Sequence, residues 1–173
     1  IDLHSTQIQA AFRGPFENLS ARNLIAEEIK KRIKHQKDCL IVAPDAGSAK
    51  NSSRLAAELN LPVIFLPKSR DEKDPSKITR YQTTEDLNNR TCIIIDDMID
   101  TGGTIISAAE VLKKSGAEKI IVCATHGIFS DNAVERILKS DIDLVITTDS
   151  TPQKEHQEVL GNRLQVISIA KLL

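Results

Sequence analysis

The chain has 173 residues, a formal net charge of −1 at pH 7, 40% hydrophobic residues and 27% charged residues. This composition is ordinary for a globular protein with one core, and it argues against a disordered chain. The balanced charge and the aromatic content of 3%, without tryptophan, argue against nucleic-acid binding, and no apolar run approaches the ~20 residues that a membrane span needs.

The first half of the chain predicts alternating helices and strands. Apolar residues at helical spacing predict a helix over residues 20–36, with Ser20 as its N-cap. The apolar run 39–43 predicts a strand, residues 48–59 predict a second helix, and residues 63–66 predict the next strand. Each predicted strand is short and continuously apolar, as expected for a strand that is covered on both faces.

Residues 68–80, with the sequence KSRDEKDPSKITR, interrupt this pattern, because no aliphatic residue appears before Ile78. Taken alone, such a charged run is a solvated loop. Since it follows a strand of the predicted sheet directly, a second interpretation is a mobile lid that brings cations to a polyanionic ligand.

The second half of the chain continues the alternation to residue 169. Strands are predicted over 92–95, 120–124, 143–147 and 164–169, and helices over 104–115 and 131–139. Short apolar strands separated by helices indicate an α/β fold with a central, mostly parallel sheet flanked by helices. We therefore predict one domain over residues 1–173.

The three cysteines lie in apolar, strand-like runs rather than in a spaced framework. Cys39, Cys92 and Cys123 stand in CLIVA, CIII and IIVCA. A reduced cysteine in such a place behaves as a small hydrophobic residue, so we predict no disulfides and a cytoplasmic location.

A glycine-containing turn follows the strand predicted over 92–95. In IIIDDMIDTGGT, residues 93–104, Gly102 and Gly103 allow the backbone to approach a ligand closely. The helix that follows presents unpaired N–H groups and a partial positive charge, and Thr101 and Thr104 add hydroxyl donors. The turn predicts a phosphate cradle, although it matches neither the P-loop nor the Rossmann glycine pattern.

The carboxylates beside this turn require a different ligand group. Asp96 and Asp97 would repel a phosphate that they faced, but they suit neutral hydroxyl groups such as those of a ribose. A sugar phosphate satisfies the acidic pair and the cradle together.

The stretch DDMIDTGGT, residues 96–104, also resembles the motif that binds phosphoribosyl pyrophosphate (PRPP) in type I phosphoribosyltransferases and PRPP synthetases. Four other stretches are similar to segments of ribose-phosphate pyrophosphokinase, in that enzyme's order. They are DLHSTQIQAAF (2–12), VAPDAGSAK (42–50), KSR (68–70) and ATHGIFS (124–130). The resemblance implies a fold like that of the type I phosphoribosyltransferases.

The resemblance also implies an activity, the transfer of diphosphate from Mg-ATP to the 1-hydroxyl of ribose 5-phosphate, giving PRPP and AMP. It implies that ribose 5-phosphate and PRPP are held by the residues of one motif together with Arg70. The motif residues are Asp96, Asp97, Asp100, Thr101, Gly102, Gly103 and Thr104. Lys68 and Arg70 would be catalytic, because their charge would stabilise the transferred diphosphate.

The resemblance implies Mg²⁺ as the cofactor, with His4 and Asp45 helping to position it on ATP. Magnesium prefers oxygen ligands and keeps water molecules, so His4 would act through water or not at all. Asp45 would otherwise cap the helix that follows it. Asp2 is a weaker metal candidate, and His126 is interpreted as structural or as part of a ribose pocket.

The resemblance covers the second half of a family whose enzymes have two similar α/β domains and form homo-oligomers, hexamers at full length. We expect ribose 5-phosphate and ATP as partners, inorganic phosphate as an activator, a missing upstream segment, and no PRPP synthesis by this chain alone. The sequence departs from the family at Ala10, Ser48 and Asn51. Two alternatives remain open: a stand-alone type I phosphoribosyltransferase, and a non-catalytic regulatory relative.

Overall fold

A computed structural model describes residues 1–5, 7–33, 35–66, 68–70, 78–81, 83 and 85–172, and for residues 68–70 and 78–81 it describes the backbone alone. Six parallel strands form one sheet in the order β2-β1-β5-β6-β7-β8. The strands are β1 (Cys39–Ala43), β2 (Val63–Phe65), β5 (Thr91–Ile99), β6 (Lys119–Gly127), β7 (Leu144–Thr148) and β8 (Leu164–Ile167). The predicted α/β class and parallel sheet are confirmed.

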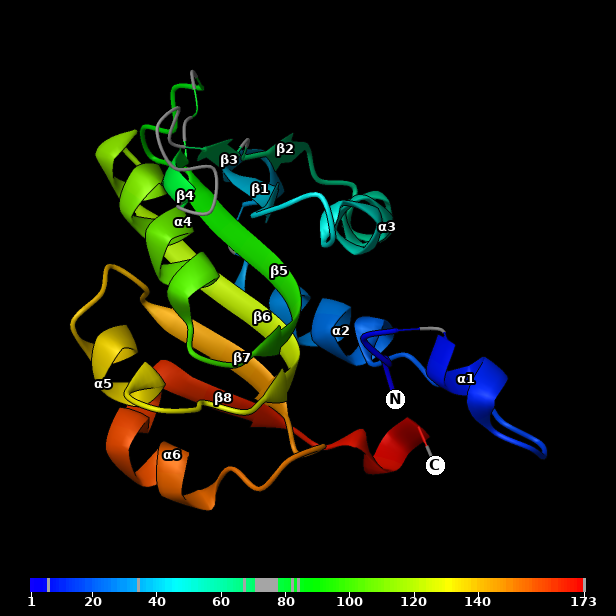
Figure 1. The fold of residues 1–173 in the computed structure, drawn as a ribbon. Coiled ribbons are helices and arrows are strands. Elements are labelled where there is room, and N and C mark those ends of the chain that lie inside the picture. The colour runs from blue at the N-terminus through cyan, green and yellow to red at the C-terminus, as the bar shows by residue number, and fades with distance from the viewer. Residues whose placement is uncertain are drawn as a thin grey trace.

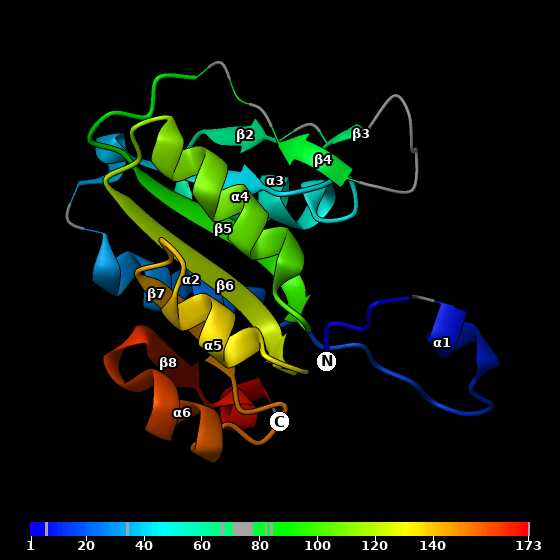
Figure 2. The ribbon, with the colours of Figure 1, turned by 60° about the vertical axis from the view of Figure 1, so that its left-hand side comes forward.

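Helices cover both faces of this sheet (Figures 1 and 2). The α-helices are α1 (Gln7–Ala11), α2 (Arg22–Arg32), α3 (Ala49–Leu59), α4 (Gly103–Lys114), α5 (Ala133–Leu138) and α6 (Lys154–Leu160). Short 3₁₀ turns occupy Gln36–Asp38, Gly161–Arg163 and Ile169–Leu172.

The core has two layers because successive residues of a strand point to opposite faces. Ile94 and Val122 belong to the layer that α4, α5 and α6 cover. Ile93 and Ile121 belong to the layer that α2 and α3 cover. Cys39, Cys92 and Cys123 are all free and buried, as predicted.

The strand that carries the acidic pair is longer than predicted. β5 continues through Asp96 and Asp97 to Ile99, whereas the sequence predicted a strand that stops at residue 95. The reason is its neighbour β6, which also extends and pairs Asp96 with Ala124 and Met98 with His126. The acidic pair therefore lies on a sheet strand and not in the turn.

The charged segment 68–80 is not entirely a loop. Its two ends form an antiparallel pair, β3 (Lys68–Arg70) with β4 (Ile78–Tyr81), which lies outside the main sheet. Residues 71–77 and the side chains of Lys68 and Arg70 lie outside the described part of the chain.

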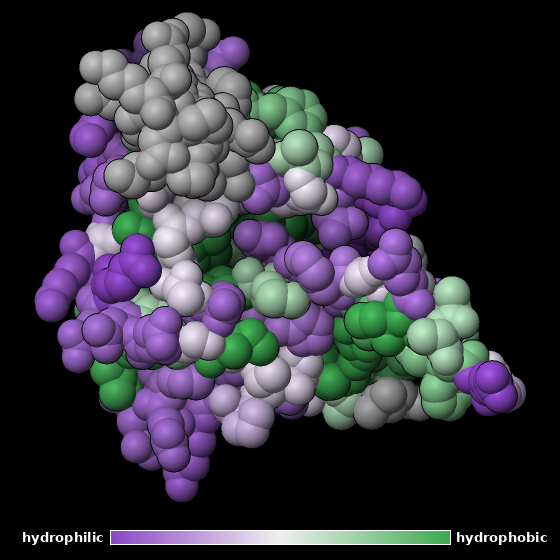
Figure 3. Space-filling view, viewed as in Figure 1, coloured by the Kyte–Doolittle hydropathy of each residue, from purple (hydrophilic) through white to green (hydrophobic). Residues whose placement is uncertain are grey.

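Helix α1 projects from the body of the molecule (Figures 1 and 2). None of the residues of α1 is buried, and Ile8 in this helix and Phe12 just after it are among the exposed hydrophobic residues. Apolar surface gathers where this projecting segment, called the arm below, leaves the body of the molecule (Figure 3). Among the described residues, no helix is long and apolar enough to cross a membrane.

Candidate functional site

The predicted cradle lies at the carboxyl end of β5, in the loop that leads into α4. Gly102 is the N-cap of α4 and has φ of +73°, a conformation that a side chain disfavours. A cleft of about 250 Å³ opens there. It is lined by Asp96, Met98, Ile99, Asp100, Thr101, Gly102, Gly103, Thr104 and Ile105. The fold thus brings Asp96 and the whole predicted cradle around one opening, beside the free N–H groups of a twelve-residue helix.

The two carboxylates of the acidic pair have different surroundings. Asp96 accepts a hydrogen bond from the backbone N–H of Asp97 at 2.9 Å. Burial, together with the nearby charges of Asp97 and Asp45, raises the pKa of Asp96 to about 7, although the hydrogen bond from the Asp97 N–H acts in the opposite direction. Asp96 is therefore poised to exchange a proton near neutral pH.

Asp97 contacts the N-terminal segment of the chain. Its Oδ2 lies 2.6 Å from Nδ1 of His4. The hydrogen bond and the negative charge of Asp97 raise the pKa of His4. The sequence predicted both groups as site residues but not that they would pair, because 93 positions separate them.

Asp2, the weaker metal candidate, makes structural contacts through one carboxylate oxygen, and its role as a metal ligand stays a prediction. Its Oδ2 accepts hydrogen bonds from the backbone N–H of Ala21 at 2.8 Å and from Oγ1 of Thr125 at 2.7 Å. These bonds fasten the start of the chain to α2 and β6, which is a structural role.

His126 also holds the start of the chain. Its Nε2 lies 3.1 Å from the carbonyl oxygen of Ile1 and 3.3 Å from that of Asp2. Its Nδ1 lies 2.8 Å from Oγ of Ser150. Of the two interpretations left open for His126, the contacts of the described residues support the structural one.

Asp45 occupies the turn between β1 and α3. Its Oδ1 accepts a hydrogen bond from the N–H of Ser48 at 2.9 Å, and Oγ of Ser48 donates to the carbonyl oxygen of Asp45 at 2.9 Å. Ser48 is buried, so the residue that departs from the family pattern holds this turn closed. Asp45 also lies near enough to Asp96 to raise its pKa.

Magnesium stays a prediction for this chain, and both residues predicted to position it, His4 and Asp45, are among the described residues. Within the described part of the chain, no three His, Cys, Asp or Glu side chains are grouped to hold a metal. His4 already contacts Asp97 through Nδ1. Magnesium takes one or two carboxylates and completes its shell with water and phosphate oxygens. Asp45 supplies a carboxylate, the type of ligand that magnesium prefers, and His4 would act through water.

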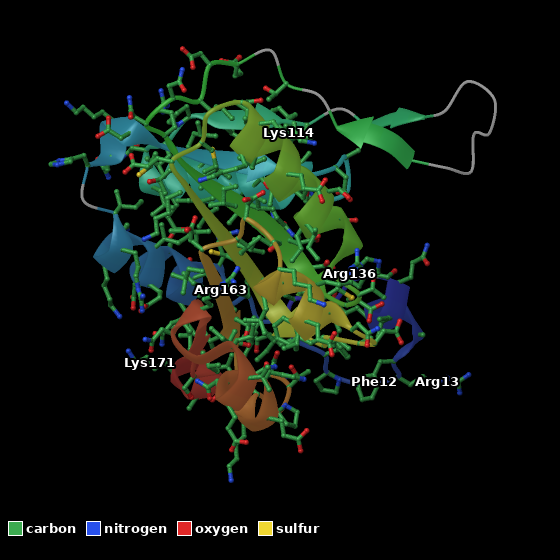
Figure 4. All side chains as sticks on the ribbon, turned by 90° about the vertical axis from the view of Figure 1, so that its left-hand side faces the viewer. Phe12, Arg13, Lys114, Arg136, Arg163 and Lys171 are labelled. Carbon is green, nitrogen blue, oxygen red and sulfur yellow. The ribbon has the colours of Figure 1, made fainter. Side chains whose placement is uncertain are left out.

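Arg136 is a residue beside the cradle that the sequence did not reveal. Its Nη1 donates a hydrogen bond to the carbonyl oxygen of Thr101 at 3.0 Å. Figure 4 places its side chain beside the end of α4 opposite Lys114, which is the end that begins at Gly103. An arginine on a predicted surface helix carries no signal of this contact, since Thr101 lies 35 positions away.

Comparison with known proteins shows which family the chain belongs to. The family model described as "Phosphoribosyl synthetase-associated domain" matches residues 64–173. A ribose-phosphate pyrophosphokinase from Corynebacterium glutamicum is 38% identical, with the match covering all of this chain and 52% of the relative. The chain thus spans about half the length of the curated relatives that it matches.

Solved structures agree on the fold. The crystal structure of phosphoribosylpyrophosphate synthetase from Mycobacterium smegmatis matches with a TM-score of 0.82 and 35% identity, over 98% of this chain and 53% of that one. An adenine phosphoribosyltransferase matches with a TM-score of 0.52 and 20% identity, over 73% of this chain and 75% of that one. The second likeness concerns the fold alone, and it agrees with the predicted type I phosphoribosyltransferase architecture.

Proposed function

The chain belongs to the phosphoribosyl synthetase-associated domain family, and from this premise we propose that it is the ribose 5-phosphate domain of a ribose-phosphate diphosphokinase. On this proposal it is the second of two domains and carries the catalytic loop. The observation that supports it best is the cleft at the carboxyl end of β5, where Asp96 and the cradle meet. Similarity to PRPP synthetases along the whole chain supports the same conclusion.

Each half of the cleft suits one half of ribose 5-phosphate. The backbone N–H groups of residues 101–104 suit the 5-phosphate, because the start of α4 favours negative charge. Asp96 lines the cleft and suits a ribose hydroxyl as a hydrogen-bond acceptor. Asp97 does not line it, but it lines a neighbouring pocket to which Asp96 also contributes, so it suits the next hydroxyl. Along the chain, Asp100 lies between the acidic pair and residues 101–104, and it lines the same cleft.

The reaction requires positioning and neutralisation of charge more than covalent participation by the protein. The 1-hydroxyl oxygen attacks the β-phosphorus of ATP, the bond from that phosphorus to the α-phosphate oxygen breaks, and AMP leaves. Magnesium bound to the phosphates would neutralise charge, with Asp45 and His4 as its candidates on this chain. Lys68 and Arg70 would stabilise the transferred diphosphate, and Arg70 would also contact the sugar phosphate.

The wider assembly belongs to the same proposal. We expect the full-length protein to be a cytoplasmic homo-oligomer, a hexamer by the resemblance described above, with inorganic phosphate as an activator. Light scattering gives the oligomeric state, and the rate measured against phosphate concentration gives the activation.

The test is an assay of the full-length protein with ribose 5-phosphate, ATP and Mg²⁺, in which AMP and PRPP are measured by chromatography. We expect both products in equal amounts. Lys68→Ala and Arg70→Ala should lower kcat by about 100-fold or more while changing KM for ribose 5-phosphate much less, because these charges act in the transition state.

The same assay distinguishes the alternatives. Consumption of PRPP with a nucleobase, without AMP formation from ATP, would identify a phosphoribosyltransferase. Inactivity of the wild-type full-length protein in both reactions would identify a non-catalytic relative and would overturn the proposal.

A further inference from the structure

The position of His4 depends on the backbone that carries it. The His4 side chain is 71% exposed, and its contact with Asp97 is its only hydrogen bond among the described residues. An exposed ring with one side-chain partner is not fixed by packing. Whether His4 meets Asp97 therefore depends on how residues 1–3 are held.

Residues 1–3 are held by two sets of hydrogen bonds. On one side the N–H of Asp2 donates to the carbonyl oxygen of Leu19 at 2.8 Å, and the N–H of Leu3 donates to Oδ1 of Asn18 at 3.3 Å. These two bonds join the segment to the strip of chain that precedes α2, and the N–H of Ala21, at the start of α2, donates to the carboxylate of Asp2. They do not connect it to the sheet.

The connection to the sheet is made by β6. Thr125 donates to the carboxylate of Asp2, and the next residue, His126, reaches the carbonyl oxygens of Ile1 and Asp2. Carbonyl oxygens only accept, so Nε2 of His126 must carry the proton and donate. His126 is thus the donor that fastens two successive peptide groups to the end of a central strand.

The ring of His126 is itself held in place. Its Nδ1 contacts Oγ of Ser150, which also lies 3.1 Å from the carbonyl oxygen of Thr125. The same carbonyl oxygen accepts a hydrogen bond from Oγ1 of Thr148, a residue without exposed surface. The ring therefore stands on a fixed base formed by the carboxyl ends of β6 and β7.

We propose that His126 is a positioning residue that sets where His4 meets Asp97 and so shapes the reaction site. The effect passes from Ser150 and β6 through His126 to the peptide groups of residues 1 and 2, and two residues further to His4. This inference rests on the proposed function for its kinetic consequence, but the geometric claim stands without it.

The kinetic test uses His126→Ala, His126→Gln and His126→Asn in the full-length protein. Alanine removes the donor, and the shorter asparagine amide does not reach the carbonyl oxygens, so both should lower kcat about 10- to 100-fold, as a misplacement of about 1 Å can do. Glutamine places an N–H donor near Nε2 and should recover most of the loss. KM for ribose 5-phosphate should change by less than about threefold, because the cradle is untouched.

A double-mutant cycle with His4→Ala separates positioning from a general structural effect. If His126 acts through His4, each double variant with His126→Ala or His126→Asn should have a kcat within about twofold of that of His4→Ala alone. Losses that multiply would overturn the proposal. So would a glutamine variant that is no better than asparagine.

A spectroscopic test keeps the inference independent of activity. In the 173-residue chain, long-range ¹H–¹⁵N correlation spectra report the environment of each His4 ring nitrogen. His126→Asn should shift the His4 signals toward those of Asp97→Asn, and His126→Gln should not. The matched control is His156→Ala, since His156 is similarly half-buried but contacts Gln153 and Phe129 rather than residues 1–5.

The outcomes distinguish this inference from the proposed function. An inactive wild-type enzyme would overturn the function while the spectra still test His126. Unchanged His4 signals in a folded His126→Asn variant would overturn the inference, whatever the enzyme does.

Discussion

Asp96 is a cleft residue whose acidity the fold changes strongly. An aspartate in water has a pKa of about 3.9. Burial raises the pKa of Asp96 to about 7, and the neighbouring charges of Asp97 and Asp45 act in the same direction. Since the chain can bind a proton here in the folded state and release it on unfolding, stability is linked to pH.

The first prediction concerns this linkage. Between pH ~4 and ~7 the folded chain holds a proton on Asp96 that the unfolded chain has released, so stability should fall as pH rises through this window. Urea midpoints of the 173-residue chain should therefore decline from pH 4.5 to pH 7, and Asp96→Asn should flatten the decline. His4, whose pKa is also raised, loses its contribution only above its unfolded pKa near 6.5. Glu28 and Asp149, whose pKa values are lowered, change stability in the opposite sense below pH ~5, so the window between pH ~5 and ~6 reports mainly Asp96.

The control is Asp141→Asn, because Asp141 is exposed and outside the cleft. It should leave the slope of the wild type unchanged. An Asp96→Asn variant with the same slope as the wild type would contradict the assigned protonation.

The second prediction tests the cradle residue by residue. Asp100→Ala and Thr101→Val each remove a polar side chain from the cleft, so each should weaken binding of ribose 5-phosphate about 3- to 10-fold. Titration calorimetry of the 173-residue chain measures this. Asp141→Ala is the control and should bind as the wild type does. Equal affinity in all four proteins would contradict the placement of the 5-phosphate at residues 101–104.

At the scale of the elements, helix α5 supports the cradle from outside. Arg136 of α5 donates to the carbonyl oxygen of Thr101, and Ala133 lies 4.0 Å from the place that a Cβ on Gly102 would take. The loop before α5 adds two backbone bonds, from Ile128 and Phe129 to the carbonyl oxygen of Ile99. The turn 100–102 is therefore held by a helix that follows it by thirty residues.

The third prediction follows from this support. Arg136→Ala should raise the dissociation constant for ribose 5-phosphate about 10-fold, because a hydrogen bond from a charged donor that orders the cradle is lost. Arg136→Lys should recover part of the affinity. Lys139→Ala serves as the control, since Lys139 follows α5 and pairs with Glu135 rather than with the cradle. Similar affinities for Arg136→Ala and Lys139→Ala would show that the link to Thr101 does not matter for binding.

At the scale of the whole molecule, the described residues form a site suited to phosphate groups, but they form no aromatic pocket suited to an adenine ring. Phe12 and Phe16 form a pair with centroids 5.4 Å apart on the projecting arm, Phe129 is buried, and Phe65 lies on the edge strand β2. None of these four rings lines the cleft at the cradle.

The fourth prediction is that the 173-residue chain folds and binds ribose 5-phosphate but releases no AMP. Its sheet is covered on both faces, so it contains the core that folding requires, whereas ATP held only by its phosphates would lack the positioning that transfer needs. Chromatography after incubation with ATP and ribose 5-phosphate should detect AMP only when the full-length protein is used. Turnover by the chain alone at about 1 to 100 per second, a rate ordinary for a kinase, would contradict this and place an adenine site within these residues.

The sequence by itself determined what depends on neighbours along the chain. The six sheet strands were predicted because each is a short apolar run, and the cradle was predicted because Asp100 to Thr104 are contiguous and their glycines and helix start act locally. The short helices α1 and α6 were missed, since five and seven residues give little periodicity. The strand pair at Lys68–Arg70 and Ile78–Tyr81 was also missed, because its charged sequence carries no alternation of apolar residues.

Only the tertiary structure decided how distant residues meet. The extension of β5 through the acidic pair depends on its ladder with β6. The pairing of His4 with Asp97 depends on the hydrogen bonds from His126 to the carbonyl oxygens of residues 1 and 2. The support of Thr101 by Arg136 is likewise a contact between separate elements. Such contacts follow from the packing of helices and strands around one sheet, and a pattern read along the chain contains no information about them.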